Sequence, residues 1–272
     1  MAPSLSTASY GPAFWAKTLA VIATVGLSLG PVTLLVLTSF ARHWYWPALL
    51  PPEYSFRAWK DIASLSSGIT SALATSAGIA MLVTVVAVVI GLPAARALGL
   101  NEFRGKRTVI FLLLLPVLTP PLASTMGVHA LFLRYGLTDS LVGVMLVHLI
   151  PTVPYSVLML SSTFTNFDTN WEAQARTLGA SPLATWWHVT LPAIAPGIAI
   201  AAVFAFLISW SQYLITLFVG GGHIVTLPLL LVAFQRSGDQ AIAAALSLVF
   251  LTPTFVLFAT AARFLKPNPS GR

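Results

Sequence analysis

The chain has 272 residues, of which 57% are hydrophobic and only 8% are charged. Soluble domains carry about 25% charged residues, so this composition excludes a soluble protein and makes the lipid bilayer the main solvent. Cysteine is absent, which excludes disulfides, thiol nucleophiles and thiolate metal sites. The formal net charge of +7 is explained by basic residues in cytoplasmic loops, and we do not expect a nucleic acid partner.

Six apolar segments are long enough to cross the hydrocarbon core, which takes about 20 residues in a helix. In chain order they are Thr18–Phe40, Gly68–Pro93, Thr108–Leu133, Leu141–Ser162, Ala193–Val219 and Ala241–Phe264. Lipid offers backbone groups no hydrogen-bond partner, so each segment is expected to be helical. The sequence therefore predicts an all-α integral membrane protein with six transmembrane helices.

Basic residues orient the six segments. With the N-terminus inside, most of the 14 lysines and arginines fall in inner loops, and Arg104, Lys106 and Arg107 cluster beside a segment end. Because lysine and arginine gather in cytoplasmic loops, we expect both termini to be cytoplasmic. The predicted organisation is an N-terminal tail, first helix and outer interfacial loop at 1–67, a five-helix core at 68–264 and a cytoplasmic tail at 265–272.

The predicted outer loop at 41–67 is rich in aromatic residues. These side chains are of the kind that lie at the membrane interface, so we interpret them as anchors, with solute contact as the alternative. They are Trp44, Tyr45, Trp46 and Trp59. Arg57, Lys60 and Asp61 indicate a short interfacial or capping helix in the same loop.

Prolines interrupt the third and fourth segments. Pro116, Pro120 and Pro121 lie in the third segment, and the fourth carries two more. Proline kinks a helix and frees carbonyl groups, so these kinks serve helix packing or surround a substrate site. His129 and His148, in the same segments, have no metal-ligating partner at helical spacing. We expect each histidine to be hydrogen-bonded across helices.

The loop before the fifth segment contains signals for two helices. The stretch Thr169–Glu172 has the spacing of a capping box, which starts a helix, and Gly179 supplies the left-handed conformation that ends one. The pair Ser181-Pro182 begins a second helix, because serine caps it and proline fits its first position. The pair Leu191-Pro192 is expected to close it. This helix–turn–helix either docks in a groove of a partner protein or rests on lipid headgroups.

This loop resembles the EAA loop of permeases of type I, MetI-like ABC importers. That family's pattern is Glu-Ala-Ala, three residues, Gly, nine residues, Ile, one residue and Leu-Pro. Counting from Gly179, the Ile position holds Val189 and the motif ends at Leu191-Pro192. At the front of the motif, Ala173, Gln174 and Ala175 occupy the Glu-Ala-Ala positions, and Glu172 stands one residue early. A carboxylate displaced by one helical residue points about 100° away, so we expect Glu172 to act as the helix cap.

The resemblance extends over the segment pattern from Gly68 to Phe264 and is nearest in layout to the polyamine-type branch. It implies the MetI-like fold with a cytoplasmic coupling helix in an EAA-like loop at 163–192, in a bacterial inner membrane. The residues it implies for ATPase coupling are Glu172, Ala175, Gly179, Ala180, Ser181, Val189, Leu191 and Pro192. The partners it implies are separate ABC ATPase subunits holding ATP-Mg, a second permease subunit and an external solute-binding protein.

Polar residues in the fifth segment mark a candidate substrate pathway. Ser209, Gln212 and Tyr213 lie where relatives line the pathway, and Ser209 and Gln212 share a helix face. Polar side chains within a membrane are costly and often functional, but serine and glutamine also bond neighbouring helices. Both interpretations remain open from the sequence.

Two other classes of protein are weaker alternatives. An ion-coupled secondary transporter is disfavoured because no acid lies in the first five segments to carry the ion. A membrane enzyme is disfavoured because the acidic residues are scattered in loops and no phosphate-binding loop is present. We therefore expect no catalytic residue, metal or cofactor on this chain. Relatives in the polyamine branch often carry an acid near Gln212, so a neutral polar solute or an organic anion stays open beside a polyamine.

Overall fold

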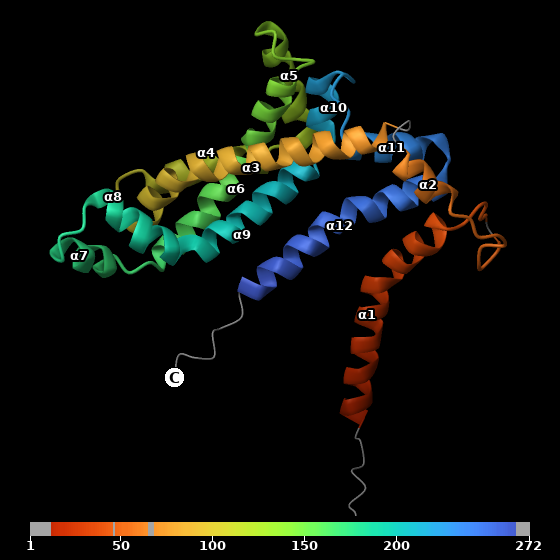
Figure 1. Cartoon of the computed structure of the whole chain (residues 1–272), viewed down its shortest axis with the longest axis horizontal. Coiled ribbons are helices and arrows are strands. Elements are labelled where there is room, and N and C mark those ends of the chain that lie inside the picture. Colours follow the sequence, from red (N-terminus) through yellow and green to blue (C-terminus); the bar gives the residue numbers. More distant parts are fainter. Residues whose placement is uncertain (1–11, 46, 65–67, 265–272) are drawn as a thin grey trace, which may run out of the picture. The chain divides into compact units, whose positions relative to one another are not determined.

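The computed structural model describes residues 12–45, 47–64 and 68–264, and helices account for most of them (Figure 1). The tails at 1–11 and 265–272 and the predicted anchor Trp46 lie outside the described residues. The helices before the loop at 166–190 are α1 (Pro12–Ser39), α2 (Arg57–Ala63), α3 (Ile69–Leu100), α4 (Lys106–Leu118), α5 (Pro121–Arg134) and α6 (Leu141–Thr165). Those that follow are α7 (Asn170–Thr177), α8 (Pro182–Thr185), a π-helical turn (Trp186–Thr190), α9 (Leu191–Trp210), α10 (Leu214–Gly220), α11 (Leu227–Ser237) and α12 (Gln240–Phe264).

Within the described residues, five helical stretches are each long and apolar enough to cross a membrane. They are Lys17–Ser39, Ile69–Leu100, Leu141–Thr165, Pro182–Trp210 and Gln240–Leu257. Helices α4 and α5 qualify together as a sixth, although their axes differ in direction by 97°. The predicted all-α membrane fold is therefore confirmed, with up to six spans.

Two predicted spans are broken. The third is interrupted at its prolines, as the sequence predicts, whereas the prediction of the fifth as a continuous helix is wrong. The segment predicted at Thr108–Leu133 bends between α4 and α5, where Thr119 and Pro120 leave the helical conformation. Pro121 then starts α5, because a proline fits the first turn of a helix. The segment predicted at Ala193–Val219 ends its first helix at Trp210 and resumes only at α10.

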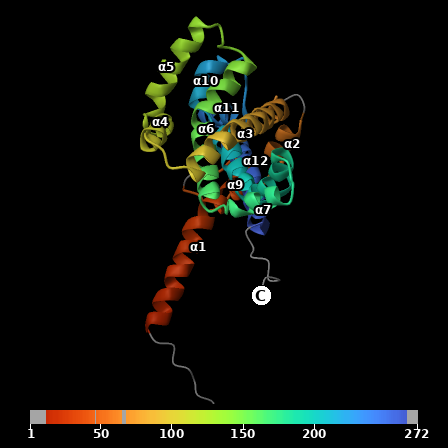
Figure 2. The same ribbon diagram turned by 90° about the vertical axis from the view of Figure 1, so that its left-hand side faces the viewer.

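One compact unit contains residues 64–233 and the chain from Phe250 onward. Its centre is a bundle of α3, α6 and α9, which lie side by side in Figures 1 and 2. Gly197 of α9 faces Thr163 of α6 so closely that a Cβ atom at Gly197 would clash with the threonine side chain. Small residues of this kind let membrane helices approach closely, since lipid provides no hydrophobic drive for their association. The bundle thereby fixes the ends of α6 and α9, between which the EAA-like loop lies.

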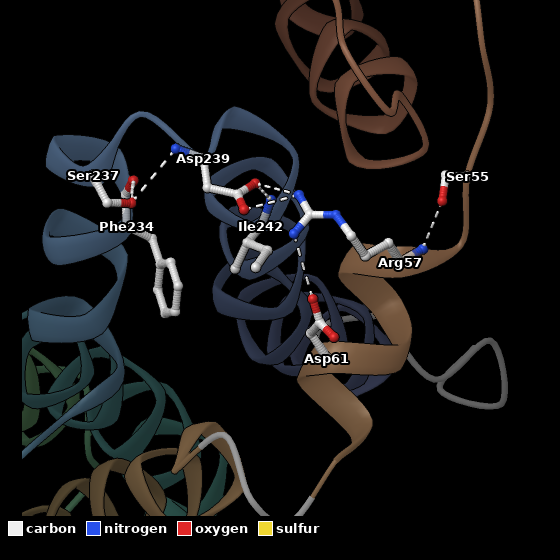
Figure 3. A network of polar contacts seen from close by, with 7 residues as sticks. All are labelled: Ser55, Arg57, Asp61, Phe234, Ser237, Asp239 and Ile242. Carbon is white, nitrogen blue, oxygen red and sulfur yellow. Dashed lines mark hydrogen bonds and ion pairs between the residues drawn. The ribbon is translucent and has the colours of Figure 1, made fainter.

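The second unit contains the chain up to Ala63 together with Phe234–Val249. The predicted short helix in the outer loop is confirmed as α2. Its Arg57 binds both carboxylate oxygens of Asp239 at 2.8 Å (Figure 3). Asp239 also accepts a hydrogen bond from the backbone N–H of Ile242 and so caps α12. This ion pair ties the outer loop to the start of the last helix.

Candidate functional site

The loop between α6 and α9 contains two short helices separated by a glycine turn. Gly179 has a φ of +88°, and the predicted left-handed glycine at the end of α7 is confirmed. The N–H of Gly179 donates to the carbonyl of Arg176, and that of Ala180 donates to Ala175. This pair of bonds is the Schellman motif, which satisfies the last carbonyls of a helix. The turn thus has a defined shape set by one residue type.

The second helix begins as predicted but does not end as predicted. The Ser181 hydroxyl accepts a hydrogen bond from the N–H of Ala184, and Pro182 occupies the first turn of α8. The prediction that Leu191-Pro192 closes this helix is wrong, because helical backbone continues from Pro182 to Trp210. The π-helical turn Trp186–Thr190 precedes Pro192 and makes room for a residue that lacks a backbone N–H.

The predicted capping box at Thr169–Glu172 is also wrong. Thr169 has helical backbone angles, and its side chain makes no cap hydrogen bond. The carboxylate of Asp168 instead accepts from the N–H of Asn170 at 2.9 Å. Glu172 is buried, and its carboxylate accepts a hydrogen bond from a residue of α3 instead of capping the start of α7.

That partner is Arg96. Its Nη1 and Nη2 donate to the two carboxylate oxygens of Glu172 at 2.8 and 2.7 Å, in the bidentate geometry that arginine favours. The Thr190 hydroxyl donates to the same carboxylate, so this one group joins α3, α7 and the π-helical turn. The side chain of Glu172 is 8% exposed and that of Arg96 is 31% exposed. We refer to Arg96, Glu172 and Thr190 as the loop anchor.

Electrostatics favours the charged form of Glu172. Hydrogen bonding from Arg96 lowers the pKa of the Glu172 carboxyl, burial partly opposes this shift, and the bond from Thr190 lowers the pKa further. The Arg96 guanidinium also lies 5.8 Å from the ring centre of Phe164 and 5.6 Å from that of Trp186. Aromatic faces attract such a cation, so the anchor is charged, paired and packed.

Outside the anchor, the loop exposes large apolar side chains. Leu178 is 89% exposed and Leu183 is 67% exposed, while Trp171 and Trp187 are exposed as well. The other predicted coupling residues divide by burial: Ala175, Ala180, Val189 and Leu191 are half-buried, and Gly179, Ser181 and Pro192 are exposed. The structure therefore gathers the predicted residues in one loop, which has an anchored inner face and an outer face that includes large apolar side chains.

A cavity of about 440 Å³ lies where the two broken spans meet. The predicted pathway residues Gln212 and Tyr213 line it together with Ser211, all from the unwound segment 211–213. Facing residues come from α4, α5 and the bend between them, and they include Pro116, Thr119, Pro121, Ser124 and Thr125. Ser209 does not line this cavity.

Ser209 is buried and hydrogen-bonds His148 at 2.9 Å. The interhelical alternative is therefore the one that describes Ser209. His148 is confirmed as a histidine bonded across helices, whereas His129 packs edge-on against Phe218 and has no hydrogen-bond partner for Nδ1 among the described residues. Sequence reasoning missed Arg96, whose partner is 76 residues away. The only signal was a charge at the end of a long apolar segment.

Comparison with known proteins matches residues 128–267 to the family described as binding-protein-dependent transport system inner membrane component. The molybdenum transport system permease protein ModB of Mycobacterium tuberculosis is 33% identical over 210 residues, which cover 72% of this chain and 78% of that protein. The spermidine/putrescine permease PotC of Haemophilus influenzae is 25% identical, covering 84% and 87% of the two chains.

The fold is also found in a solved structure of a bacterial ABC transporter involved in the import of the acidic polysaccharide alginate. The TM-score is 0.69 at 17% identity, with 94% of this chain and 99% of that chain covered. Fold and relatives together define the class as a permease subunit of an ABC importer. The chain belongs to the family of binding-protein-dependent transport system inner membrane components.

Proposed function

We propose that this permease is driven by a separate ABC ATPase, which docks on the loop at 171–192. The observation that carries the proposal is the combination of large exposed apolar side chains on this loop with a partly buried ion pair behind them. Leu178 and Leu183 project from the loop, as expected of a short helix that fits a groove in another protein. The loop anchor connects the same loop to α3 and, through the π-helical turn, to α9.

The side of the membrane on which the loop lies supports an ATPase partner. The cytoplasmic end of the bundle is inferred from Arg104, Lys106 and Arg107, which follow α3. The last turn of α3 lies against the last turn of α6, since Gly99 packs against Phe164. The loop that follows α6 is therefore on the same side as the basic cluster, where ATP is available. We propose cytoplasmic termini separately, from the distribution of lysine and arginine along the sequence.

We propose the remaining partners from the family to which the chain belongs. A second permease subunit completes the pathway, an external solute-binding protein delivers the solute, and ATP-Mg binds the ATPase subunits. The residues that line the cavity in the described chain supply hydroxyls and the amide of Gln212, and they include no carboxylate. A cationic solute is best met by acids or aromatic cages, so we propose a neutral polar or anionic solute in an inner-membrane importer.

The test replaces Gly179 with proline, which cannot adopt a φ of +88°. The complex is purified from native membranes through a tag on this chain, and the ATPase subunit is identified by its phosphate-binding-loop sequence. Gly179→Pro is expected to insert normally but to lose the ATPase subunit and ATP-driven uptake. Co-purification of an undiminished ATPase subunit with this variant contradicts the proposal.

Gly222→Pro is the matched control, because Gly222 has a φ of +81° and, like Gly179, has no atom near its missing Cβ. It lies beyond α10, outside the proposed docking loop, and it is expected to retain the ATPase. A second pair tests the apolar surface itself. Leu183→Asp is expected to weaken ATPase binding, whereas Leu49→Asp, at an 83% exposed leucine of the outer loop, is expected to leave it unchanged.

A further inference from the structure

The break in the fifth span is bridged by one side chain from another helix. His148 of α6 is 2% exposed and lies between the helices on either side of the break. Its Nδ1 is 2.9 Å from the hydroxyl of Ser209, on the last turn of α9. Its Nε2 is 2.9 Å from the hydroxyl of Thr216, on the first turn of α10. Both hydroxyl residues are buried, so these bonds are shielded from water.

The hydrogen-bond partners fix the direction of each bond. The Thr216 hydroxyl donates its proton to the carbonyl of Gln212 at 3.1 Å, so its oxygen accepts from the Nε2–H of His148. With its proton on Nε2, the neutral imidazole accepts at Nδ1 from the Ser209 hydroxyl. One chain of bonds thus runs from α9 through the imidazole to a backbone carbonyl in the unwound segment.

This chain of bonds explains how an unwound segment is stable inside a membrane. Backbone groups that leave a helix need new partners there, because lipid supplies none. The carbonyl of Gln212 accepts a hydrogen bond from the Thr216 hydroxyl, and the imidazole of His148 holds that hydroxyl in place. The same segment presents Gln212 to the cavity.

We propose that His148 is a positioning residue of the transport pathway, holding the segment 211–213 unwound so that Gln212 faces the cavity. This role rests on the proposed transport function. Without the imidazole, the Thr216 hydroxyl loses its orientation and the carbonyl of Gln212 returns to a helical partner. The span then closes over the break and turns residue 212 away from the cavity.

The absence of cysteine makes a direct test simple. Gln212→Cys places a single thiol in this chain, and its rate of reaction with a small water-soluble methanethiosulfonate is read as a mass shift of the chain in the purified complex. We expect His148→Leu to slow this reaction at least about tenfold. Ser124→Cys, across the cavity on α5, is the matched control and is expected to react at an unchanged rate.

Conservative variants separate positioning from packing. His148→Gln keeps a donor for Thr216 and is expected to restore most of the labelling rate. The shorter side chain of His148→Asn reaches only toward Ser209, so this variant is expected not to restore the labelling rate. Thr216→Val removes the hydroxyl at nearly constant volume and is expected to match His148→Leu, which makes the test independent of how well any histidine variant folds. Thr216→Ser is expected to behave as the unmodified protein.

An unchanged rate at Gln212→Cys in the His148→Leu and Thr216→Val backgrounds overturns the proposal. Equal slowing at Gln212→Cys and Ser124→Cys also overturns it, because His148 is then only a core residue whose loss distorts the whole cavity. The labelling needs neither ATP nor solute. Its outcome is therefore distinguishable from loss of the ATPase partner, which tests the proposed function.

Discussion

Replacing Glu172, a buried residue of the loop at 171–192, with glutamine is expected to destabilise the permease strongly. The change removes the charge that pairs with Arg96 while preserving the size of the side chain. Removing one partner of a buried ion pair costs about 3–5 kcal/mol. Arg96 is 31% exposed and recovers part of its hydration, so we expect a loss near the lower end, about 3 kcal/mol.

The assay is equilibrium unfolding in mixed detergent micelles, applied to a double-mutant cycle. Glu172→Gln, Arg96→Gln and the double variant are compared with the unmodified protein, which isolates the energy of the pair from the loss of either side chain. The Arg57–Asp239 pair provides the matched control with side chains 46% and 26% exposed. Exposed pairs contribute about 0–1 kcal/mol, so Arg57→Gln and Asp239→Asn are expected to show a small coupling.

A coupling energy for Arg96 and Glu172 no larger than that of the control pair refutes this reasoning. In that case the short distances at the loop anchor reflect geometry without a net contribution to stability. A large coupling energy, found in variants that still bind the ATPase normally, means that the pair contributes to stability and not to docking. That result shows that the loop anchor stabilises the loop without being required for ATPase docking.

Two further predictions concern acid and packing. Because Arg96 lowers the pKa of Glu172, the anchor's contribution is complete above the ordinary carboxyl pKa of 4.5 and is lost as pH falls through the lowered pKa. Unfolding measured from pH 7 down to pH 3 is expected to show this loss in the unmodified protein and not in Glu172→Gln. Gly197→Ala is expected to destabilise by about 1–3 kcal/mol through its clash with Thr163. Gly78→Ala in α3, where a Cβ meets open space, is expected to be neutral or stabilising by up to about 1 kcal/mol, and the same unfolding assay ranks the two.

The positions of the helices were predictable because the bilayer dictates their length and composition. The breaks within two of them were harder to predict. Pro120 and Pro121 are visible signals for the bend after α4, yet the apolar run continues through them. The break at 211–213 contains no proline, and its carbonyl partner depends on His148 from another helix. A tertiary contact of this kind leaves no local pattern.

The coupling loop shows the same division between local and distant causes. Gly179 and Ser181 act on their own neighbours, so their roles in helix ends followed from residue type and spacing. Glu172 has the spacing of a cap, but a half-buried arginine outcompetes a backbone N–H for its carboxylate. Because Arg96 is 76 residues away in the chain, the sequence alone favoured the nearer partner.

The continuous helical stretch Pro182–Trp210 connects these two regions mechanically. Its 29 residues, at 1.5 Å each, span about 43 Å, which is enough to reach from the coupling loop through the bilayer core. Thr190, near one end, belongs to the loop anchor, and Ser209, at the other end, bonds His148. Under the proposed function, a displacement that the ATPase imposes on the loop therefore arrives at the unwound segment as movement of a rigid helix. Loss of Arg96 is then expected to uncouple ATP hydrolysis from movement of this helix while leaving Gln212→Cys reactive. Loss of His148 is expected to slow the reaction of Gln212→Cys while leaving ATP hydrolysis coupled to that movement.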